Sequence, residues 1–138
     1  MTEYLAAAII DMRLHATAQG PGDPPVDADA FEKAVLDALG MPPEVVMRHR
    51  TAQFFHVFGG EGYAAGYYAY LWAEVLDHDA FAAFTEAGGP YDPEVADRLL
   101  RDILSVGDTV DPAHAFRAFR GRDPDVGAYL RAKGFEPA

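Results

Sequence analysis

The chain has 138 residues, half of them hydrophobic, and its acidic residues outnumber the basic ones 22 to 11. This size predicts a single domain over residues 1–138, and the negative charge argues against nucleic acid and anionic membranes as partners. The absence of cysteine excludes disulfides and thiolate chemistry. The apolar run over residues 5–10 is too short to span a bilayer, so we expect a cytoplasmic protein.

The first half of the chain predicts two helices separated by a loop. Residues 2–15 read as a helix that Thr2 can cap, with a wide apolar stripe of Leu5, Ile9 and Met12 and the neighbouring Ala8 and Ile10. Residues 18–26 are dense in glycine and proline and predict a loop. A second helix begins at a cap, Asp27 or Asp29, and runs through Leu39 to a stop at Gly40, and a short turn or helix follows Pro42 and Pro43.

The second half predicts a long helix followed by three shorter ones. The long helix can run from about residue 64 to residue 86. Each later helix is expected to begin at an Asp-Pro pair and to end before a glycine; the pairs and stops are Asp92-Pro93 with Gly107, Asp111-Pro112 with Gly121, and Asp123-Pro124 with Gly134. Residues 54–58 are the only strand candidate. The predicted fold is therefore all-α, a compact array of several helices.

Residues 53–74, QFFHVFGGEGYAAGYYAYLWAE, are the most unusual stretch. Three glycines precede a run of tyrosines, and glycine favours a turn or connection in which side chains must be absent. If a helix begins near Gly62, then Tyr63, Tyr67, Tyr70 and Glu74 share one face. Phenol hydroxyls suit hydrogen bonding to a carbonyl or a developing oxyanion, and His56 could do the same. The alternative is an ordinary half-buried helix face with its polar tips in water, which the pattern alone slightly favours.

The sequence lacks the motifs of several common catalytic centres. Its five histidines form no HExxH pair, and His49 with His56 would need further ligands, so we expect no metal site within this chain. The glycines lack the Gly-Lys-Ser/Thr ending of a phosphate loop, and no GxSxG motif is present.

The segment HVFGGEGYAAGYYAYLWAEVL, residues 56–76, closely resembles the C-terminal substrate-binding motif of a zinc peptidase family. That family includes thimet oligopeptidase, neurolysin, oligopeptidase A and bacterial peptidyl-dipeptidase. TEYLAAAIIDMRLH near the start is similar to the helix that follows the family's active-site region. DPEVADRLLRDILSVG, FRAFRGRDP and LRAKGF look like its C-terminal tail. The resemblance spans almost the whole chain and implies the C-terminal helical subdomain of a larger zinc peptidase fold.

The resemblance also implies roles for individual residues. Tyr70 matches the tyrosine that helps to hold the oxyanion of the tetrahedral intermediate against zinc. His56 and Tyr63 match residues that contact the substrate backbone, and Tyr67 is a further candidate on the same face. Gly59, Gly60 and Gly62 would form a mobile loop that closes over the peptide.

Two departures from the family pattern matter. The glycine turn is longer than in the best-known members, which affects the placement of His56 relative to Tyr63. The HExxH helix and the downstream glutamate ligand, which in the family lie N-terminal to these segments, are missing. We therefore expect the chain to bind short peptides but to be inactive alone, because zinc belongs to the complete family enzyme.

Several forms of the protein remain open on this interpretation. The chain could be a fragment, a truncated reading frame or half of a split enzyme, with the HExxH-bearing portion as its partner. The alternative is an independent helical module that binds peptides or another protein without catalysis. Because helices that pack against a missing portion would expose apolar surface, we also expect self-association.

Overall fold

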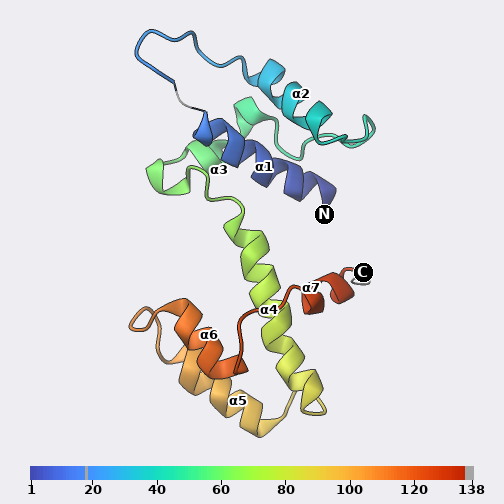
Figure 1. The fold of residues 1–138 in the computed structure, drawn as a ribbon, viewed down its shortest axis with the longest axis vertical. Helices are drawn as coiled ribbons and strands as arrows, with labels where there is room; N and C mark the ends of the chain where they lie inside the picture. Colours follow the sequence, from blue (N-terminus) through green and yellow to red (C-terminus); the bar gives the residue numbers. More distant parts are fainter. Residues whose placement is uncertain (18, 136–138) are drawn as a thin grey trace. The chain divides into compact units, whose positions relative to one another are not determined.

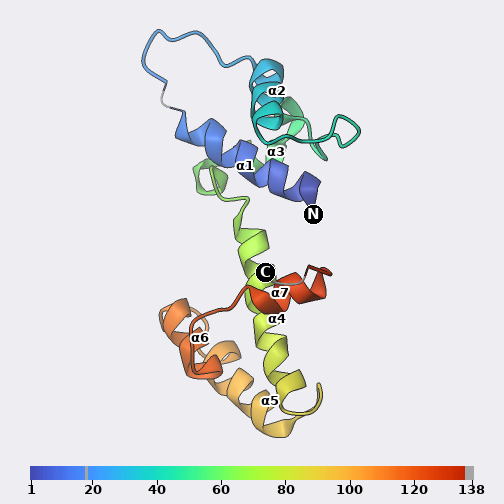
Figure 2. The same ribbon diagram turned by 45° about the vertical axis from the view of Figure 1, so that its right-hand side comes forward.

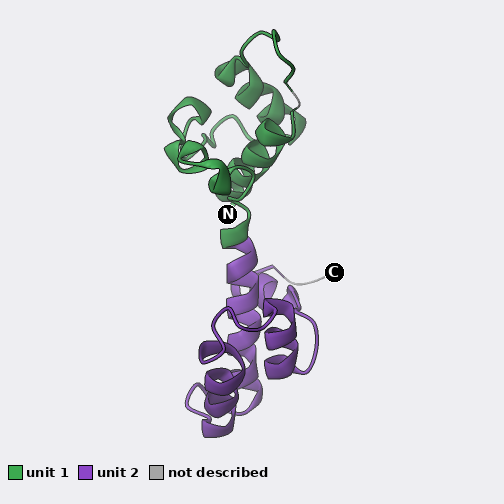
Figure 3. Ribbon diagram, turned by 90° about the vertical axis from the view of Figure 1, so that its left-hand side faces the viewer, with its two compact units in different colours: residues 1–70 green, residues 71–138 purple. Residues whose placement is uncertain are grey.

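A computed structural model describes residues 1–17 and 19–135, and within these ranges the chain forms helices and turns without a strand (Figures 1 and 2). The predicted all-α fold class is confirmed. The chain divides into two compact units, which we call unit 1 (Met1–Tyr70) and unit 2 (Leu71–Ala138) (Figure 3). The single domain expected over residues 1–138 stays a prediction. Residue 18 of the predicted loop, and residues 136–138, lie outside the described residues.

Unit 1 contains α1 (Thr2–Ala16), α2 (Ala28–Ala38), the 3-10 turns η1 (Thr51–Gln53) and η2 (Glu61–Tyr63), and α3 (Phe55–Phe58) between those turns. Its core combines small residues of α1 with larger side chains from later segments; the buried members are Ala6, Ala7, Ile10, Val35, Met47, Phe54 and Val57. The small side chains let neighbouring backbone approach α1 closely, which positions the segments that carry the candidate site.

Two details predicted for α1 are wrong. Of the predicted apolar stripe, Ala8 and Ile10 are buried and Ile9 packs against the core, but Leu5 and Met12 are exposed. The N-cap is Met1 rather than Thr2, and no side chain caps the helix. The buried face also includes the carboxylate of Asp11, which is fully inaccessible to solvent.

The second helix follows its sequence signals more closely. The carboxylate of Asp27 accepts hydrogen bonds from the backbone N–H groups of Asp29 and Ala30, and Gly40 ends the helix with a φ of 64°. The predicted turn after Pro42 is present. Within α2, the buried Glu32 accepts hydrogen bonds from the backbone and hydroxyl of Thr51 at 2.7 and 2.9 Å, which ties η1 to this helix.

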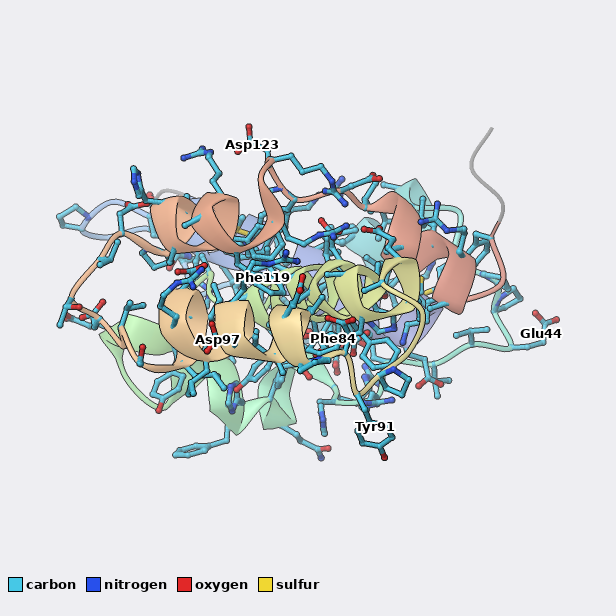
Figure 4. The ribbon with its side chains drawn as sticks, turned by 90° about the horizontal axis from the view of Figure 1, so that it is seen from below. Glu44, Phe84, Tyr91, Asp97, Phe119 and Asp123 are labelled. Atoms are coloured by element: carbon cyan, nitrogen blue, oxygen red, sulfur yellow. The ribbon has the colours of Figure 1, made fainter. Side chains whose placement is uncertain are left out.

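Unit 2 is built around α4 (Ala69–Glu86), although the first two residues of this helix belong to unit 1. Its other elements are α5 (Pro93–Leu99), the π-helical turn η3 (Leu100–Leu104), α6 (Pro112–Arg120) and α7 (Gly127–Ala132). Its core contains Phe84 of α4 and Phe119 of α6, both labelled in Figure 4, together with Ala83 and Val95. These side chains join three helices through one apolar cluster.

Two of the three Asp-Pro helix starts are confirmed. Asp92 caps α5 through the N–H of Val95, and Asp111 caps α6 through the N–H of His114. The third is wrong, because α7 begins at Gly127 without a side-chain cap. The carboxylate of Asp123 instead pairs with Arg117 at 2.6 Å.

A buried carboxylate fixes the end of α6 and the segment after it to α4. Asp79 is fully inaccessible and accepts hydrogen bonds from Arg120, from both terminal nitrogens of Arg122 and from the backbone N–H of Asp125. Burial alone would raise the pKa of Asp79, but the bonds from Arg122 and Asp125 and the charge of Arg120 outweigh it and hold the pKa below its usual value. Glu86 shares Arg120 at 2.8 Å, and this hydrogen bond lowers the pKa of Glu86 as well.

Unit 2 also contains a large apolar groove between α4, η3 and α6. Its volume is about 950 Å³, and its lining includes Trp72, Phe81 and Leu104, each more than half exposed.

No described helix combines the length and hydropathy needed to cross a bilayer.

Candidate functional site

One imidazole and three phenol rings converge on the surface of unit 1. We call His56, Tyr63, Tyr67 and Tyr70 the tyrosine cluster. The centroid of the His56 ring lies 5.3 Å from that of Tyr63, 5.7 Å from that of Tyr67 and 5.6 Å from that of Tyr70. The rings of Tyr67 and Tyr70 are 5.5 Å apart and meet edge to face. The four residues named from the sequence therefore form one group around His56.

The backbone that brings these rings together is not the predicted helix. α4 begins at Ala69, so Tyr63 lies in η2, Tyr67 in a turn and only Tyr70 in the helix, while His56 comes from α3. The predicted start of the long helix, at about residue 64, is therefore wrong, and a shared helix face does not cause the convergence of Tyr63, Tyr67 and Tyr70. Residues 54–58, the strand candidate, contain α3 instead.

Tyr70 and His56 make the one side-chain hydrogen bond within this cluster, whose four members all lie in the described part of the chain. The Tyr70 hydroxyl lies 3.0 Å from His56 Nε2, and the Tyr70 side chain is about half exposed. When Nε2 carries the hydrogen, the imidazole donates to the phenol oxygen, and the phenol hydrogen is left for another acceptor. The pair can therefore present a polarised hydroxyl donor to solvent or to a ligand.

Tyr67 anchors the cluster to the core of unit 1. Its ring packs edge to face against Phe54 at a centroid distance of 4.8 Å and lies 5.1 Å from the ring of Tyr4. Its backbone carbonyl accepts a hydrogen bond from the Tyr4 hydroxyl at 3.2 Å. Because Tyr67 is half-buried whereas Tyr63 and Tyr70 are exposed, the latter two are better placed to meet a ligand.

Asp11 is a site residue that the sequence reasoning missed. Its Oδ1 accepts the N–H of Ala65 at 3.1 Å, and its Oδ2 accepts the N–H of Tyr67 at 2.9 Å. His15 Nδ1 lies 2.8 Å from the same Oδ1. An acidic residue four positions before a histidine, within an otherwise apolar helix face, is the signal that could have indicated it.

The turn that Asp11 contacts has an uncommon backbone. Ala65 has a φ of 55°, and among the described residues it is the one non-glycine with a positive φ. For a residue with a Cβ this conformation costs about 1–2 kcal/mol. At the next position a Cβ on Gly66 would lie 3.3 Å from the carbonyl oxygen of Tyr63, so this glycine permits a close backbone approach.

The three predicted glycines of the motif show no such requirement. Gly59 and Gly60 would place a Cβ at ordinary contact distance from Phe55 and Tyr63, and a Cβ on Gly62 would meet open space. None of them has a backbone in the left-handed region. The prediction that side chains must be absent at these positions is therefore wrong for this conformation.

The residues present do not fit a zinc centre by themselves. In residues 1–17 and 19–135 no group of three or more His, Asp or Glu side chains is arranged to hold a metal ion. A structural or catalytic zinc needs at least three protein ligands in most sites. The tyrosine cluster itself offers hydrogen bonding by three phenols and one imidazole.

The chain is similar in sequence to a family of peptidases. The model of peptidase family M3 matches residues 1–135, and the chain belongs to this family. It is 40% identical over 135 residues to the dipeptidyl carboxypeptidase of Escherichia coli strain K12, and 39% identical over 130 residues to the oligopeptidase A of Haemophilus influenzae.

These matches cover 97% and 94% of this chain, respectively. An organellar oligopeptidase A of Arabidopsis thaliana is 39% identical over 94% of the chain. The chain spans less than a fifth of the length of these three relatives, which is 19%, 18% and 16% in the order given. The resemblance to the oligopeptidase and peptidyl-dipeptidase family is thus confirmed over residues 1–135.

Proposed function

We propose that this chain is the substrate-binding part of a zinc-dependent oligopeptidase or peptidyl-dipeptidase that hydrolyses short peptides. The observation that supports this most directly is the convergence of Tyr63, Tyr67 and Tyr70 around His56, with the Tyr70 hydroxyl 3.0 Å from His56 Nε2. Membership of peptidase family M3 supports the class of reaction. A cytoplasmic location is part of this proposal.

In this proposal Tyr70 donates a hydrogen bond to the carbonyl oxygen of the peptide bond that is cleaved. That oxygen gains negative charge when the carbonyl is attacked, so a fixed donor stabilises the transition state more than the ground state. His56 keeps the Tyr70 hydroxyl oriented by donating to its oxygen from Nε2. The exposure of Tyr70 supports this role, because the hydroxyl is accessible to a ligand from solvent.

Tyr63 and His56 contact the substrate backbone in the same proposal. The Tyr63 ring meets the His56 ring edge to face and is about half exposed, so it borders the same surface. Gly59, Gly60 and Gly62 lie between these two residues and would let the connecting segment move over a bound peptide. Tyr67 supports the surface from below through its contacts with Phe54 and Tyr4.

The activated water for hydrolysis must come from a metal centre built by other residues. The complete enzyme would receive its zinc ligands from another part of the protein or from a partner chain. We therefore expect residues 1–138 alone to be inactive towards peptides. Bound zinc in stoichiometric amount, together with peptide hydrolysis by the purified chain, would refute that expectation.

A chimeric peptidase tests the role of Tyr70. In the dipeptidyl carboxypeptidase of Escherichia coli, the matching segment is replaced by residues 1–135 of this chain, and kcat and KM are measured on a short peptide. Tyr70→Phe removes one oxyanion donor and should lower kcat by about 100- to 1000-fold with a small change in KM.

Tyr68→Phe is the matched control for this experiment. Tyr68 is half exposed like Tyr70 and sits two residues before it, but it is not a member of the tyrosine cluster. Its kcat should stay close to that of the unmodified chimera. An active chimera in which Tyr70→Phe and Tyr68→Phe behave alike would refute the role of Tyr70. Peptide binding at the cluster combined with that result would favour a non-catalytic binding module instead.

A further inference from the structure

We propose that Asp11 is a positioning residue, whose buried carboxylate holds the turn over residues 64–68 and thereby places Tyr67 and Tyr70 against His56. The geometric part of this proposal stands on the contacts of Asp11. Its consequence for catalysis rests on the function proposed above for the tyrosine cluster. Asp11 itself does not touch the exposed surface, because its side chain is fully inaccessible.

The backbone N–H groups of the turn show why a carboxylate is needed there. Those of Ala64 and Gly66 donate to carbonyl oxygens of η2, at 3.3 and 3.2 Å. Those of Ala65 and Tyr67 donate instead to the two oxygens of Asp11. A single carboxylate therefore accepts from two N–H groups of the turn for which the local backbone provides no acceptor, and carboxylate oxygens are strong acceptors of such bonds.

α1 holds Tyr67 at both of its backbone polar groups. Asp11 accepts from the N–H of Tyr67, and the hydroxyl of Tyr4, seven residues earlier on the same helix, donates to the Tyr67 carbonyl. Residues seven apart lie two turns along one helix face. The position of Tyr67, and of α4 beginning two residues later, is thus set by α1.

His15 completes this arrangement from the next turn of α1. Its Nδ1 lies 2.8 Å from Asp11 Oδ1 and 3.3 Å from the N–H of Ala65. Nδ1 also lies 2.9 Å from the backbone carbonyl oxygen of Asp11. Both of these oxygens of Asp11 are acceptors at shorter distances than the N–H of Ala65, and one ring nitrogen cannot both donate and accept, so we assign the hydrogen to Nδ1. The His15 ring also lies 5.7 Å from that of Phe58, which ends α3 and follows His56 by two residues.

Asp11 and His15, both on α1, therefore contact the two segments that carry Tyr70 and His56. Asp11 holds the turn that leads into Tyr70, and His15 contacts the helix that carries His56. Loss of the carboxylate should release Ala65 from its left-handed conformation and let the turn relax. The distance between the Tyr70 hydroxyl and His56 Nε2 should then increase or become variable.

The first test uses the unmodified chain and needs no substitution. Amide hydrogen exchange measured by NMR should show slowed exchange at Ala65 and Tyr67, by about 10-fold or more relative to unstructured amides. Exchange at the unstructured rate at either residue would overturn the proposal. This measurement tests the two hydrogen bonds to Asp11 even if a variant at position 11 does not fold.

The second test compares two buried carboxylates of unit 1. Asp11→Asn replaces one accepting oxygen by a donor and should abolish the nuclear Overhauser contacts between the rings of His56 and Tyr70. Glu32→Gln is the matched control, because Glu32 is also buried and also accepts a backbone N–H, from Thr51. It should lower the melting temperature while leaving the His56 and Tyr70 signals in place.

A third variant separates positioning from general stability. Adding Ala65→Gly to Asp11→Asn removes the strain at position 65 and should restore part of the contact between His56 and Tyr70. Unchanged ring contacts in Asp11→Asn, or their loss to the same degree in Glu32→Gln, would overturn the proposal.

The chimeric peptidase distinguishes failure of this proposal from failure of the proposed function. There Asp11→Asn should lower kcat by about 10- to 100-fold, since small displacements of a catalytic group have effects of this size. If Asp11→Asn disrupts the ring contacts while Tyr70→Phe leaves kcat unchanged, the positioning role stands and the proposed function fails. Intact ring contacts in Asp11→Asn combined with a loss of kcat in Tyr70→Phe give the reverse conclusion.

Discussion

Replacement of Asp79 by asparagine should strongly destabilise unit 2. The carboxylate is fully buried and accepts hydrogen bonds from Arg120, Arg122 and the N–H of Asp125. Arg120 is itself almost fully buried, with 6% of its side chain exposed, so it would lose its main interior counter-charge. Glu86 would remain as its only ionic partner among the described residues.

The expected loss in the free energy of unfolding follows from the cost of removing one partner of a buried ion pair. Such changes typically cost about 3–5 kcal/mol, because the remaining charge stays buried without its partner. Asparagine retains one accepting oxygen, so we take the lower end, about 3 kcal/mol. For a unit of about 70 residues this corresponds to a fall in Tm of about 12 °C or more.

Thermal unfolding followed by tryptophan fluorescence measures this change in unit 2 selectively. Trp72 is the single tryptophan of the chain and lies on α4 in unit 2. Asp77→Asn is the control, since Asp77 is on the same helix but its side chain is 83% exposed. Its effect should stay within about 0.5 kcal/mol.

The pH dependence of the difference between wild type and Asp79→Asn provides a second check. The partners of Asp79 hold its folded-state pKa below the unfolded value of about 3.9, so its stabilisation is complete above that pH. It is lost as the pH falls through the folded-state pKa, where the carboxylate becomes protonated. A difference in stability below 1 kcal/mol at neutral pH, or one that persists unchanged at pH 2, would refute this reasoning.

Four further predictions concern stability and assembly. Phe119→Ala should cost about 3–5 kcal/mol in urea unfolding, because Phe119 is buried in the core of unit 2, whereas Tyr91→Ala should have little effect because Tyr91 is 91% exposed (Figure 4). Gly121→Ala should cost about 1 kcal/mol, because Gly121 has a φ of 75°, and Gly89→Ala, without a positive φ, serves as its control. Asp92→Ala should cost about 1 kcal/mol by removing the cap of α5, measured by the same unfolding assay. Self-association predicted from the sequence should appear in light scattering as a mass that rises with concentration, and Leu104→Glu should reduce it, whereas a constant monomer mass would contradict it.

Local signals in the sequence predicted most of the helices. Asp27, Asp92 and Asp111 cap helices because each carboxylate reaches an N–H two or three residues further on, a contact that short-range sequence specifies. Asp123 carries the same Asp-Pro signal but pairs with Arg117 and caps nothing. At that position an ion pair with Arg117 forms in place of the helix-capping hydrogen bond, and a single sequence does not reveal which of the two interactions will form.

The sequence predicted which residues form the tyrosine cluster but not how the backbone brings them together. The residues were found through the motif, yet the helix assumed to align them begins six residues after Tyr63. Their convergence depends on the left-handed Ala65, an alanine whose conformation no local rule predicts, and on Asp11 more than fifty residues earlier. The pattern of α1 can mark Asp11 as a buried acid, but helix propensity and periodicity do not specify which backbone groups more than fifty residues away it binds.

The contacts of Asp11 also bear on the order in which unit 1 assembles. Its partners lie 54 and 56 residues further along the chain, so the cluster cannot form from a short nucleus around the glycine turn. Long-range closure of this kind is slow compared with the formation of α1 or α2, which need only local contacts. The surface at His56 should therefore be among the last parts of unit 1 to mature, and its formation marks the completion of folding there.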